Sequence, residues 1–361
     1  MPERALPPGS TIGILGGGQL GRMLSMAAAR LGLKTHIYSD EAEAPAFDVA
    51  HGRTVGAYAD EDALARFAAS CQVVTCEFEN VPAETLQAAA RVVPVFPGAK
   101  SFAVAQDRLV EKNFVTGLGI PVAPYVKVDN ADDLRRALPH VRAPALLKTR
   151  RFGYDGKGQI VVRGADEIAA AVESIGHAAA LVEGIVPFER EVSVIVVRGR
   201  DGAMQFYDVV ENVHENGILA ISRAPARIAQ ALAVEAKTIA GKIADALGHV
   251  GVLCVEMFAR ESDKPALIVN EFAPRVHNSG HWTLDACLTS QFENHVRAIC
   301  GWPLGATARH SDAVMTNLIG ADVDQWRALA AEPDTAIHLY GKAEARPARK
   351  MGHVTRLYPK S

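Results

Sequence analysis

The sequence has little surplus charge, no paired cysteine motif and no long apolar run, and each shortage excludes a class of protein. Lysine and arginine number 38 against 41 aspartate and glutamate residues, and the net charge of −3 argues against a general nucleic-acid-binding protein. No apolar stretch reaches the roughly 18 residues that indicate a transmembrane helix. Residues 1–10 contain no apolar segment of a secretion signal. We therefore expect no nucleic-acid partner and no membrane.

Cysteine is sparse as well. The cysteines are odd in number and include no C-x-x-C pair, which makes a poor disulfide framework. Unpaired cysteine is among the most buried residue types. We therefore expect buried, reduced thiols in a cytoplasmic protein at Cys71, Cys76, Cys254, Cys287 and Cys300.

What is present suits a folded chain of two or three domains. Hydrophobic residues make up 49% and charged residues 22% of 361 positions, which excludes a mainly disordered chain. A strand over 11–15, a glycine turn, a helix over 22–31 and a strand over 34–38 predict the start of a doubly wound sheet.

The remaining elements divide the chain further. Prolines near residues 121–124 indicate an extended linker after the first domain and a helix. We place domains at 1–100, 101–190 and 191–361, the last 50 residues being a mixture of short strands and turns. The other predicted elements are strands over 73–76, 92–96, 145–148, 159–162, 180–183, 191–197, 203–209, 251–257 and 266–272, and helices over 101–117, 166–176, 227–247 and 291–299.

The first glycine motif follows the first strand. Gly16-x-Gly18-x-x-Gly21 matches the dinucleotide fingerprint, and Asp40 stands where a ribose-binding acid would be expected. Any strand-to-helix turn that brings backbone amides close to an anion needs such glycines. The motif therefore leaves three interpretations open, which are NAD, another anionic ligand, or a tight turn without a ligand.

A second glycine-rich loop, Arg151–Gln159, lies between two predicted strands. Its three glycines allow backbone amides to fold over a polyphosphate, and Lys157 adds positive charge. Lys148 ends the preceding apolar strand, from which it can project into a pocket. The pattern G-x-x-x-x-G-K-[ST] is absent, so this is no Walker A loop. An ordinary glycine-rich hairpin is the alternative.

Two apolar strands each carry an acid. If the strands pair in antiparallel fashion, Glu256 and Glu271 lie on one face. Buried carboxylates are costly without a partner, and Mg²⁺ prefers one or two carboxylates plus phosphate oxygens. The alternative is a salt bridge to arginine or lysine. No His/Cys ligand spacing accompanies these acids, so they do not indicate a transition metal.

Two polar segments complete the candidates. Ala273–Thr283 follows a core strand and contains Arg275, His277 and His281, a density typical of a functional site. Lys342–His353 is a basic run that either holds a phosphate or forms a solvated surface.

Together these segments resemble the ATP-grasp superfamily and, within it, the 5-(carboxyamino)imidazole ribonucleotide synthases of purine biosynthesis. The resemblance extends from about residue 11 to 358 and is strongest at Gly16–Met23, Cys76–Val81, Arg151–Gln159, Asn270–Thr283 and Arg349–His353. It implies an ATP-grasp fold of mixed α/β and α+β class, with an N-terminal doubly wound pre-ATP-grasp domain. The small ATP-grasp subdomain would carry the second glycine loop.

The resemblance also implies residue roles. Glu256 and Glu271 would bind Mg²⁺, and Asn270 would lie beside them at the phosphate end. The other ATP-contacting positions would be Arg108, Lys148, the loop residues Gly153, Tyr154, Asp155, Gly156, Lys157, Gly158 and Gln159, the adenine-hinge residues Glu183, Gly184, Ile185 and Val186, and Glu191 and His214. Tyr154, Asp155, Lys157, Arg275 and His277 would act in catalysis. The ribonucleotide would contact Gln19, Leu20, Glu77, Arg275, Asn278, Ser279, Lys342, Arg349 and Lys350.

The implied reaction is a carboxylation. Bicarbonate attacks the γ-phosphate of ATP to give ADP and carboxyphosphate, which releases CO₂ to the exocyclic amine of aminoimidazole ribonucleotide. Such a labile intermediate requires positioned anions and exclusion of water. The resemblance further implies a homodimer acting on small molecules. Rival hypotheses are a formate-using transformylase of the same superfamily, an NAD oxidoreductase, and an inactive nucleotide-binding partner protein.

Overall fold

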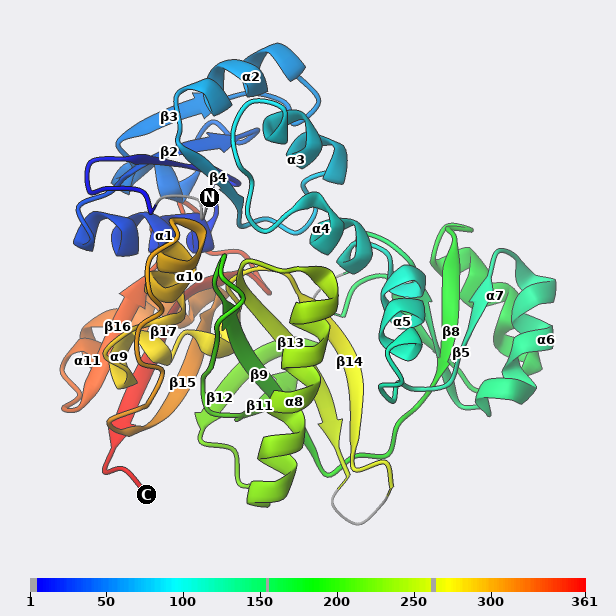
Figure 1. Cartoon of the computed structure of the whole chain (residues 1–361). Helices are drawn as coiled ribbons and strands as arrows, with labels where there is room; N and C mark the ends of the chain where they lie inside the picture. Colours follow the sequence, from blue (N-terminus) through cyan, green and yellow to red (C-terminus); the bar gives the residue numbers. More distant parts are fainter. Residues whose placement is uncertain (1–4, 154–155, 261–263) are drawn as a thin grey trace.

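The computed structural model describes residues 5–153, 156–260 and 264–361, and its strands form three sheets (Figure 1). The strands of the first sheet lie within residues 11–76, those of the second within 125–184, and those of the third within 190–358. Our domain boundary at residue 100 falls between the first two groups, and that at residue 190 falls on the first residue of the third; both remain a prediction.

The first sheet is parallel, in the order β3-β2-β1-β4. The predicted strand–glycine turn–helix–strand opening is confirmed. The predicted strand over 92–96 is wrong, because there only an isolated bridge joins Val95 to Val74. The elements are β1 (Thr11–Leu15), α1 (Gln19–Arg30), β2 (Lys34–Ser39), η1 (Pro45–Val49), β3 (Gly52–Val55), α2 (Glu61–Ala69), β4 (Val73–Cys76) and α3 (Ala83–Ala90).

The helix predicted over 101–117 is in fact two helices, α4 (Ala99–Ala105) and α5 (Arg108–Gly117). Asp107 separates them, because its side chain caps α5 by accepting hydrogen bonds from the backbone amides of Leu109 and Val110. The same carboxylate binds Arg150 at 2.6 Å. The cap therefore fixes α5 against the end of the small second sheet.

The second sheet is antiparallel, in the order β5-β8-β6-β7. Its apolar side chains form a separate hydrophobic core together with those of the helices over 131–141 and 168–174. This core includes the buried Leu134, Leu147 and Val182. Figure 1 shows this unit standing apart from the other sheets. Its elements are β5 (Tyr125–Val128), α6 (Ala131–Val141), β6 (Ala145–Thr149), β7 (Gln159–Val162), η2 (Ala165–Glu167), α7 (Ile168–Ser174) and β8 (Ala180–Gly184).

The third sheet is antiparallel and large, in the order β14-β13-β9-β11-β12-β15-β17-β16, with β10 on β9. The last 50 residues are not merely short strands, since β15 and β17 span 8 and 9 residues and join this sheet. Its strands are β9 (Arg190–Arg198), β10 (Met204–Phe206), β11 (Val210–Glu215), β12 (Ile218–Ala224), β13 (Gly251–Ala259), β14 (Leu267–Ala273), β15 (Asp312–Ile319), β16 (Thr335–Leu339) and β17 (Lys350–Tyr358).

The sequence analysis did not predict the hairpin formed by β11 and β12. Asn216 and Gly217 have φ of 52° and 79°, the left-handed conformations that suit a tight hairpin turn. The remaining helices are α8 (Gln230–Leu247), η3 (Asn278–Gly280), α9 (Thr283–Ala286), α10 (Gln291–Ile299), η4 (Gly320–Gln325) and α11 (Trp326–Ala330).

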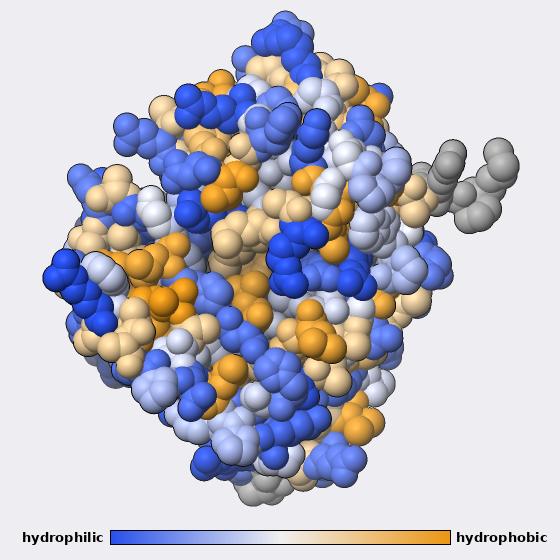
Figure 2. Space-filling model, turned by 90° about the vertical axis from the view of Figure 1, so that its left-hand side faces the viewer, coloured by the Kyte–Doolittle hydropathy of each residue, from blue (hydrophilic) through white to orange (hydrophobic). Residues whose placement is uncertain are grey.

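The N-terminal sheet and the large sheet share one hydrophobic core. Leu24 of α1 and Phe292 and Ile299 of α10 are buried in the same cluster, and α10 lies beside α1 in Figure 1. The five cysteines are buried and unpaired, as predicted. On the face seen in Figure 2, hydrophilic and hydrophobic side chains are interspersed. No helix in the described ranges is long and apolar enough to cross a membrane.

Candidate active site

The two acids predicted to share a face stand opposite each other. Antiparallel β13 and β14 pair Glu256 with Glu271, and a register irregularity follows Glu256. Directly opposite residues of an antiparallel pair project from the same face of the sheet. Both side chains are partly exposed on strands that are otherwise mostly buried. The predicted antiparallel pairing is confirmed, and its donor set of two carboxylates suits Mg²⁺.

Each acid already has a cationic partner. Arg108 on α5 binds Glu271 at 2.7 Å, and His277 Nε2 binds Glu256 at 3.0 Å. Burial would raise the pKa of Glu271, but Arg108 outweighs it and lowers that pKa to about 2. Burial disfavours the His277 imidazolium, yet Cys254 and Glu256 raise the pKa of His277 to about 10. The salt-bridge alternative is therefore present at both acids, through arginine at Glu271 and through histidine at Glu256.

A second ion cluster surrounds Glu183 on β8. Lys148 of β6 contacts one carboxylate oxygen, and Lys112 of α5 lies 2.9 Å from the other. Burial alone would raise the pKa of Glu183, but the two lysines lower it to about 2. Two ammonium groups on one carboxylate leave a surplus positive charge at a buried position, which favours an anion nearby.

Lys112 and its neighbour Glu111 are residues that the sequence analysis missed. Lys112 also donates to the carbonyl of Asn270 at 3.3 Å, and the carboxyl of Glu111 accepts from the Phe272 amide at 2.7 Å. Burial and the nearby Glu271 raise the pKa of Glu111 well above its usual range. The spacing of Arg108, Glu111 and Lys112 puts all three on one helix face, and that charged face was the available signal.

The glycine-rich loop connects β6 to β7. Gly156 and Gly158 have φ of 77° and 71°, and a Cβ on Gly158 would lie 2.5 Å from the Thr149 hydroxyl. A Cβ on Gly156 would lie 3.3 Å from the carbonyl oxygen of Asn216, so this loop runs close to the β11–β12 turn. Arg108 donates to the Gly153 carbonyl at 3.3 Å. The loop is thus connected to the guanidinium that holds Glu271.

The other loop and hinge positions that the structure describes belong to β7, β8 and the segments next to them. Tyr154 and Asp155 lie outside the described residues. Lys157 lies in the loop, and Gln159 begins β7 opposite Lys148. Gly184 ends β8, and the exposed Ile185 and half-buried Val186 lead toward β9.

A histidine on β11 completes the ATP-side positions. His214 Nδ1 lies 2.5 Å from the Glu191 carboxylate on β9. Burial would lower the pKa of His214, but the hydrogen bond that its imidazole N–H donates to Glu191 and the nearby carboxylates outweigh burial and raise the pKa. The pair therefore favours a charged imidazole opposite a carboxylate at two of the positions predicted to contact ATP.

The polar run after β14 is held by side chains from distant segments. Arg275 binds Glu79 at 2.7 Å, and His277 Nδ1 lies 2.9 Å from the Ser279 hydroxyl. Ser193 on β9 donates to Ser279 at 2.8 Å. Ser279 is fully buried, and its side chain orients His277. Its contact with the ribonucleotide stays a prediction.

Two residues near this run had no assigned role. Glu79 stands in the quoted string Cys76–Val81, and Asn317 exchanges amide hydrogen bonds of 3.0 and 2.6 Å with Asn278. Asn317 is a buried polar residue on a long strand whose pairing the sequence did not reveal.

The first glycine turn contacts a buried acid. The carboxylate of Glu77 accepts from the Gly18 amide at 2.6 Å, and a Cβ on Gly16 would approach that carboxylate to 2.8 Å. A dinucleotide pyrophosphate would need this amide, so the turn does not suit NAD. Burial raises the pKa of Glu77 to about 7. Gln19 begins α1, whereas the Leu20 side chain lies in the core, which leaves only its backbone to contact a ligand.

The basic C-terminal run folds back toward this acid. Lys342 Nζ donates to the carbonyl of Lys350 at 2.7 Å, and Arg349 donates to the Glu344 carbonyl at 3.1 Å. Burial together with Arg349 and Lys350 lowers the pKa of Lys342 to about 8, while Glu77 acts in the opposite direction. Lys342, between β16 and β17, and Glu77 beside the first glycine turn therefore act on each other's charge.

Models of three protein families match successive parts of the chain. Residues 10–106 match the ribonucleotide synthetase preATP-grasp domain, residues 113–292 the ATP-grasp domain, and residues 313–360 the phosphoribosylaminoimidazole carboxylase C-terminal domain. The protein is therefore an ATP-grasp ligase with an N-terminal pre-ATP-grasp domain, a class that uses ATP with Mg²⁺.

Known relatives define the class more narrowly. The chain is 50% identical over 363 residues to an N5-carboxyaminoimidazole ribonucleotide synthase of Brucella melitensis, with full coverage of both, and 39% identical to that of Bacillus subtilis, covering 98% and 93%. A solved ADP complex of such an enzyme has a TM-score of 0.94 at 42% identity, covering 98% and 94%. A structure from Aspergillus clavatus with ADP and 5-aminoimidazole ribonucleotide has a TM-score of 0.91 at 32% identity, covering 98% and 95%. The chain belongs to the N5-carboxyaminoimidazole ribonucleotide synthase family.

Proposed function

We propose that the protein carboxylates 5-aminoimidazole ribonucleotide with bicarbonate in an ATP-dependent step of purine synthesis, through carboxyphosphate. The observation that carries this proposal is the convergence of Glu256, Glu271 and His277 with the Lys112–Glu183–Lys148 cluster. Carboxylates, a surplus buried cation and a glycine loop together match what ATP-driven acyl-phosphate formation requires. The relatives named above, including one solved with the ribonucleotide, support the substrate.

The ATP side has the following roles in this proposal. Lys148 and the loop over residues 153–159 hold the phosphates, and Glu191 and His214 face the ribose. Glu256 and Glu271 hold Mg²⁺, which when bound neutralises phosphate charge. With Mg²⁺ on Glu256 and Glu271, Arg108 and His277, which contact these two acids, would stand beside the transferring phosphate and bicarbonate.

The acceptor side lies between the first glycine turn and the C-terminal run. Arg275 and the His277 imidazolium attract bicarbonate and carboxyphosphate, and Gln19 and Glu77 face the ribonucleotide. Lys342, Arg349 and Lys350 supply positive charge for its 5′-phosphate. Asn278 is held by Asn317 at the edge of this region.

A product assay tests the function. ADP and phosphate should form above background only when both bicarbonate and the ribonucleotide are present. ADP formation that is equally fast with formate, or without ribonucleotide, would contradict the proposal.

Isotope transfer tests the intermediate. With ¹⁸O-bicarbonate, one labelled oxygen should arrive in inorganic phosphate, because a bicarbonate oxygen is the nucleophile. Mass spectrometry of the phosphate measures it, with ¹⁸O-water as the control. Unlabelled phosphate would rule out carboxyphosphate.

We further propose a cytoplasmic homodimer. The buried, unpaired cysteines suit a reducing compartment such as the cytoplasm. The homodimer is proposed because of the family resemblance. Light scattering of the purified chain measures the oligomeric state directly.

A further inference from the structure

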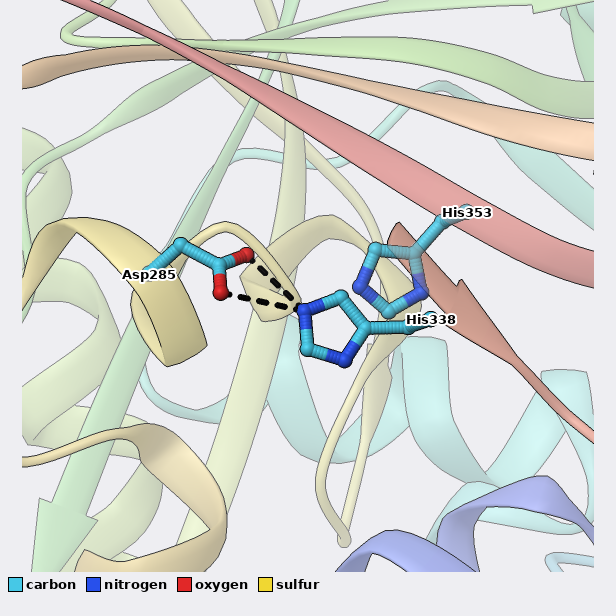
Figure 3. A group of neighbouring side chains, drawn as sticks. All are labelled: Asp285, His338 and His353. Carbon is cyan, nitrogen blue, oxygen red and sulfur yellow. Dashed lines mark hydrogen bonds and ion pairs between the residues drawn. The ribbon is translucent and has the colours of Figure 1, made fainter. Parts of the chain in front are cut away.

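We propose that Asp285, His338 and His353 bind a divalent transition-metal ion of the Zn²⁺ class. One ligand atom from each residue lies within 4.8 Å of the others. His338 Nε2 is 3.0 Å from both carboxylate oxygens of Asp285. Figure 3 shows the Asp285 carboxylate from α9 directed at the His338 ring, with the His353 ring beside it.

Strand pairing places the two imidazoles together. β16 and β17 pair His338 directly opposite His353, and the rings stack with centroids 4.5 Å apart and planes inclined by 12°. Because directly opposite residues share a face of the sheet, both rings stand over the same side, where α9 brings the carboxylate. Three separate segments thus converge on one point.

His353 supplies the independent sign of a ligand. Its side chain is fully buried, and its Nδ1 lies 2.8 Å from the Tyr340 hydroxyl. Its Nε2 is buried and has no hydrogen-bond partner among the residues that the structure describes, and in Figure 3 this nitrogen is on the ring edge that faces His338 and Asp285. A proton on Nδ1, donated to Tyr340, leaves the Nε2 lone pair for a metal, and such a second partner commonly orients a metal-binding histidine.

The donor set selects the metal class. Two imidazole nitrogens and one carboxylate suit Zn²⁺ and related ions, whereas Mg²⁺ prefers oxygen ligands. The side chains of His338 and Asp285 are 25% and 13% exposed, which gives an ion and a water ligand access from solvent. The site is separate from Glu256 and Glu271 and does not depend on the proposed reaction. A bound ion would tie α9 to β17, the strand that begins at Lys350.

Cobalt binding tests the site without using catalysis. The full chain, stripped by chelator and kept in excess Mg²⁺ to occupy oxygen-ligand sites, is titrated with Co²⁺. We expect a visible ligand-field band that saturates near one ion per chain and is abolished by Zn²⁺. Asp285→Asn keeps the shape and a hydrogen-bond acceptor for His338, so the variant should fold, yet it should bind at least about tenfold more weakly. His338→Gln should behave alike.

Matched controls separate this site from surface binding. Asp324→Asn and His51→Gln change exposed residues elsewhere and should bind Co²⁺ like the parent. Zn²⁺ should raise the melting temperature of the parent and the controls but not of Asp285→Asn. Absence of a saturable band, or equal binding by Asp285→Asn and His338→Gln, would overturn the proposal. That outcome leaves the carboxylation assay unaffected, so the two hypotheses can fail separately.

Discussion

Glu77 shows how a single buried residue can be held at a cost to stability. Its carboxylate is buried beside the first glycine turn, where burial raises its pKa from 4.5 to about 7. Between these pH values the folded protein binds more protons than the unfolded chain, so stability falls as pH rises. At 1.36 kcal/mol per pH unit the cost above pH 7 is roughly 3 kcal/mol.

Replacing this acid should therefore stabilise the protein in a pH-dependent way. Glu77→Gln should raise the free energy of unfolding by about 1–3 kcal/mol at pH 8 and by much less at pH 5. Urea unfolding at the two pH values measures it. The exposed Glu235→Gln serves as control and should show no such difference. Equal effects at both pH values would mean that Glu77 ionises normally in the folded state.

Glu271 is the residue whose loss should affect turnover most. Glu271→Gln removes one charged ligand at the proposed Mg²⁺ position, and metal stabilisation of transition-state charge is worth several kcal/mol. At 1.36 kcal/mol per tenfold, we expect kcat to fall by about 100-fold or more. ADP formation over a range of Mg²⁺ concentrations measures this loss, with circular dichroism to verify folding.

The control for this loss is another ion-paired glutamate. Glu332 binds Arg356 at 2.7 Å on the C-terminal sheet, and Glu332→Gln should leave turnover near that of the parent. Near-normal activity and an unchanged Mg²⁺ requirement in Glu271→Gln would refute the metal role.

At the scale of elements, α5 joins the small sheet to the large one through charge. It carries Arg108 toward Glu271 on β14 and Lys112 toward Glu183 on β8. Lys112 is almost fully buried, so its pair with Glu183 is not screened as a surface pair would be. The helix therefore sets how the two sheets meet at the site.

Removing Lys112 should accordingly destabilise the protein. Lys112→Met deletes a charged hydrogen bond to Glu183, and a loss of about 1.5–3 kcal/mol is expected. Chemical unfolding of the single variants and of Lys112→Met/Glu183→Gln forms a double-mutant cycle that measures the coupling. Lys127→Met, which breaks the exposed pair with Asp129, should cost less than about 1 kcal/mol. Strict additivity in the cycle would show that the buried pair contributes nothing.

At the scale of the whole molecule, segments from the first and the last parts of the chain lie close together, although the two termini do not (Figure 1). Lys342, in the segment between β16 and β17, acts to lower the pKa of Glu77, and α1 shares a core with α10. The proposed ribonucleotide site therefore requires residues more than 260 positions apart, such as Glu77 and Lys342.

The basic run tests this arrangement. If Arg349 and Lys350 hold the 5′-phosphate, each contributes about 1.5–3 kcal/mol. Replacing one by alanine should then lower kcat/KM for the ribonucleotide by roughly 10- to 150-fold. The double variant should lose more, and the KM for ATP should barely change. Steady-state kinetics with each substrate varied in turn measures these changes in kcat/KM and KM. Raised ionic strength should weaken ribonucleotide use more in the parent than in the double variant.

Arg346→Ala is the matched control for the basic run. Arg346 is exposed and binds Glu344 within the same segment, so its loss should change neither KM. If the parent and Arg349→Ala/Lys350→Ala have the same KM and kcat for the ribonucleotide, the basic run is part of the solvated surface and does not bind the phosphate.

The sequence by itself determined the elements whose signals are local. The strand–turn–helix opening, α10 and the antiparallel pairing of Glu256 with Glu271 followed from apolar spacing, glycines and short turns, because neighbouring residues carry those signals. The same motifs pointed to the family and to most of the candidate site positions. The break at Asp107 was missed even though a capping aspartate is a local signal, since the surrounding apolar pattern resembled one continuous helix.

Only the tertiary structure decided which charges meet. The contacts in question join residues that lie from 53 to 196 positions apart in the sequence. They are the pair Lys112–Glu183, the pair Arg275–Glu79 and the contacts of Asp285 with His338 and His353. Only His338 and His353 are closer to each other than this. No periodicity encodes such distances, because side-chain spacing reports only the face of one element. Burial decided the rest: a carboxylate or imidazole acquires its altered pKa and its partner only when packing removes the surrounding water.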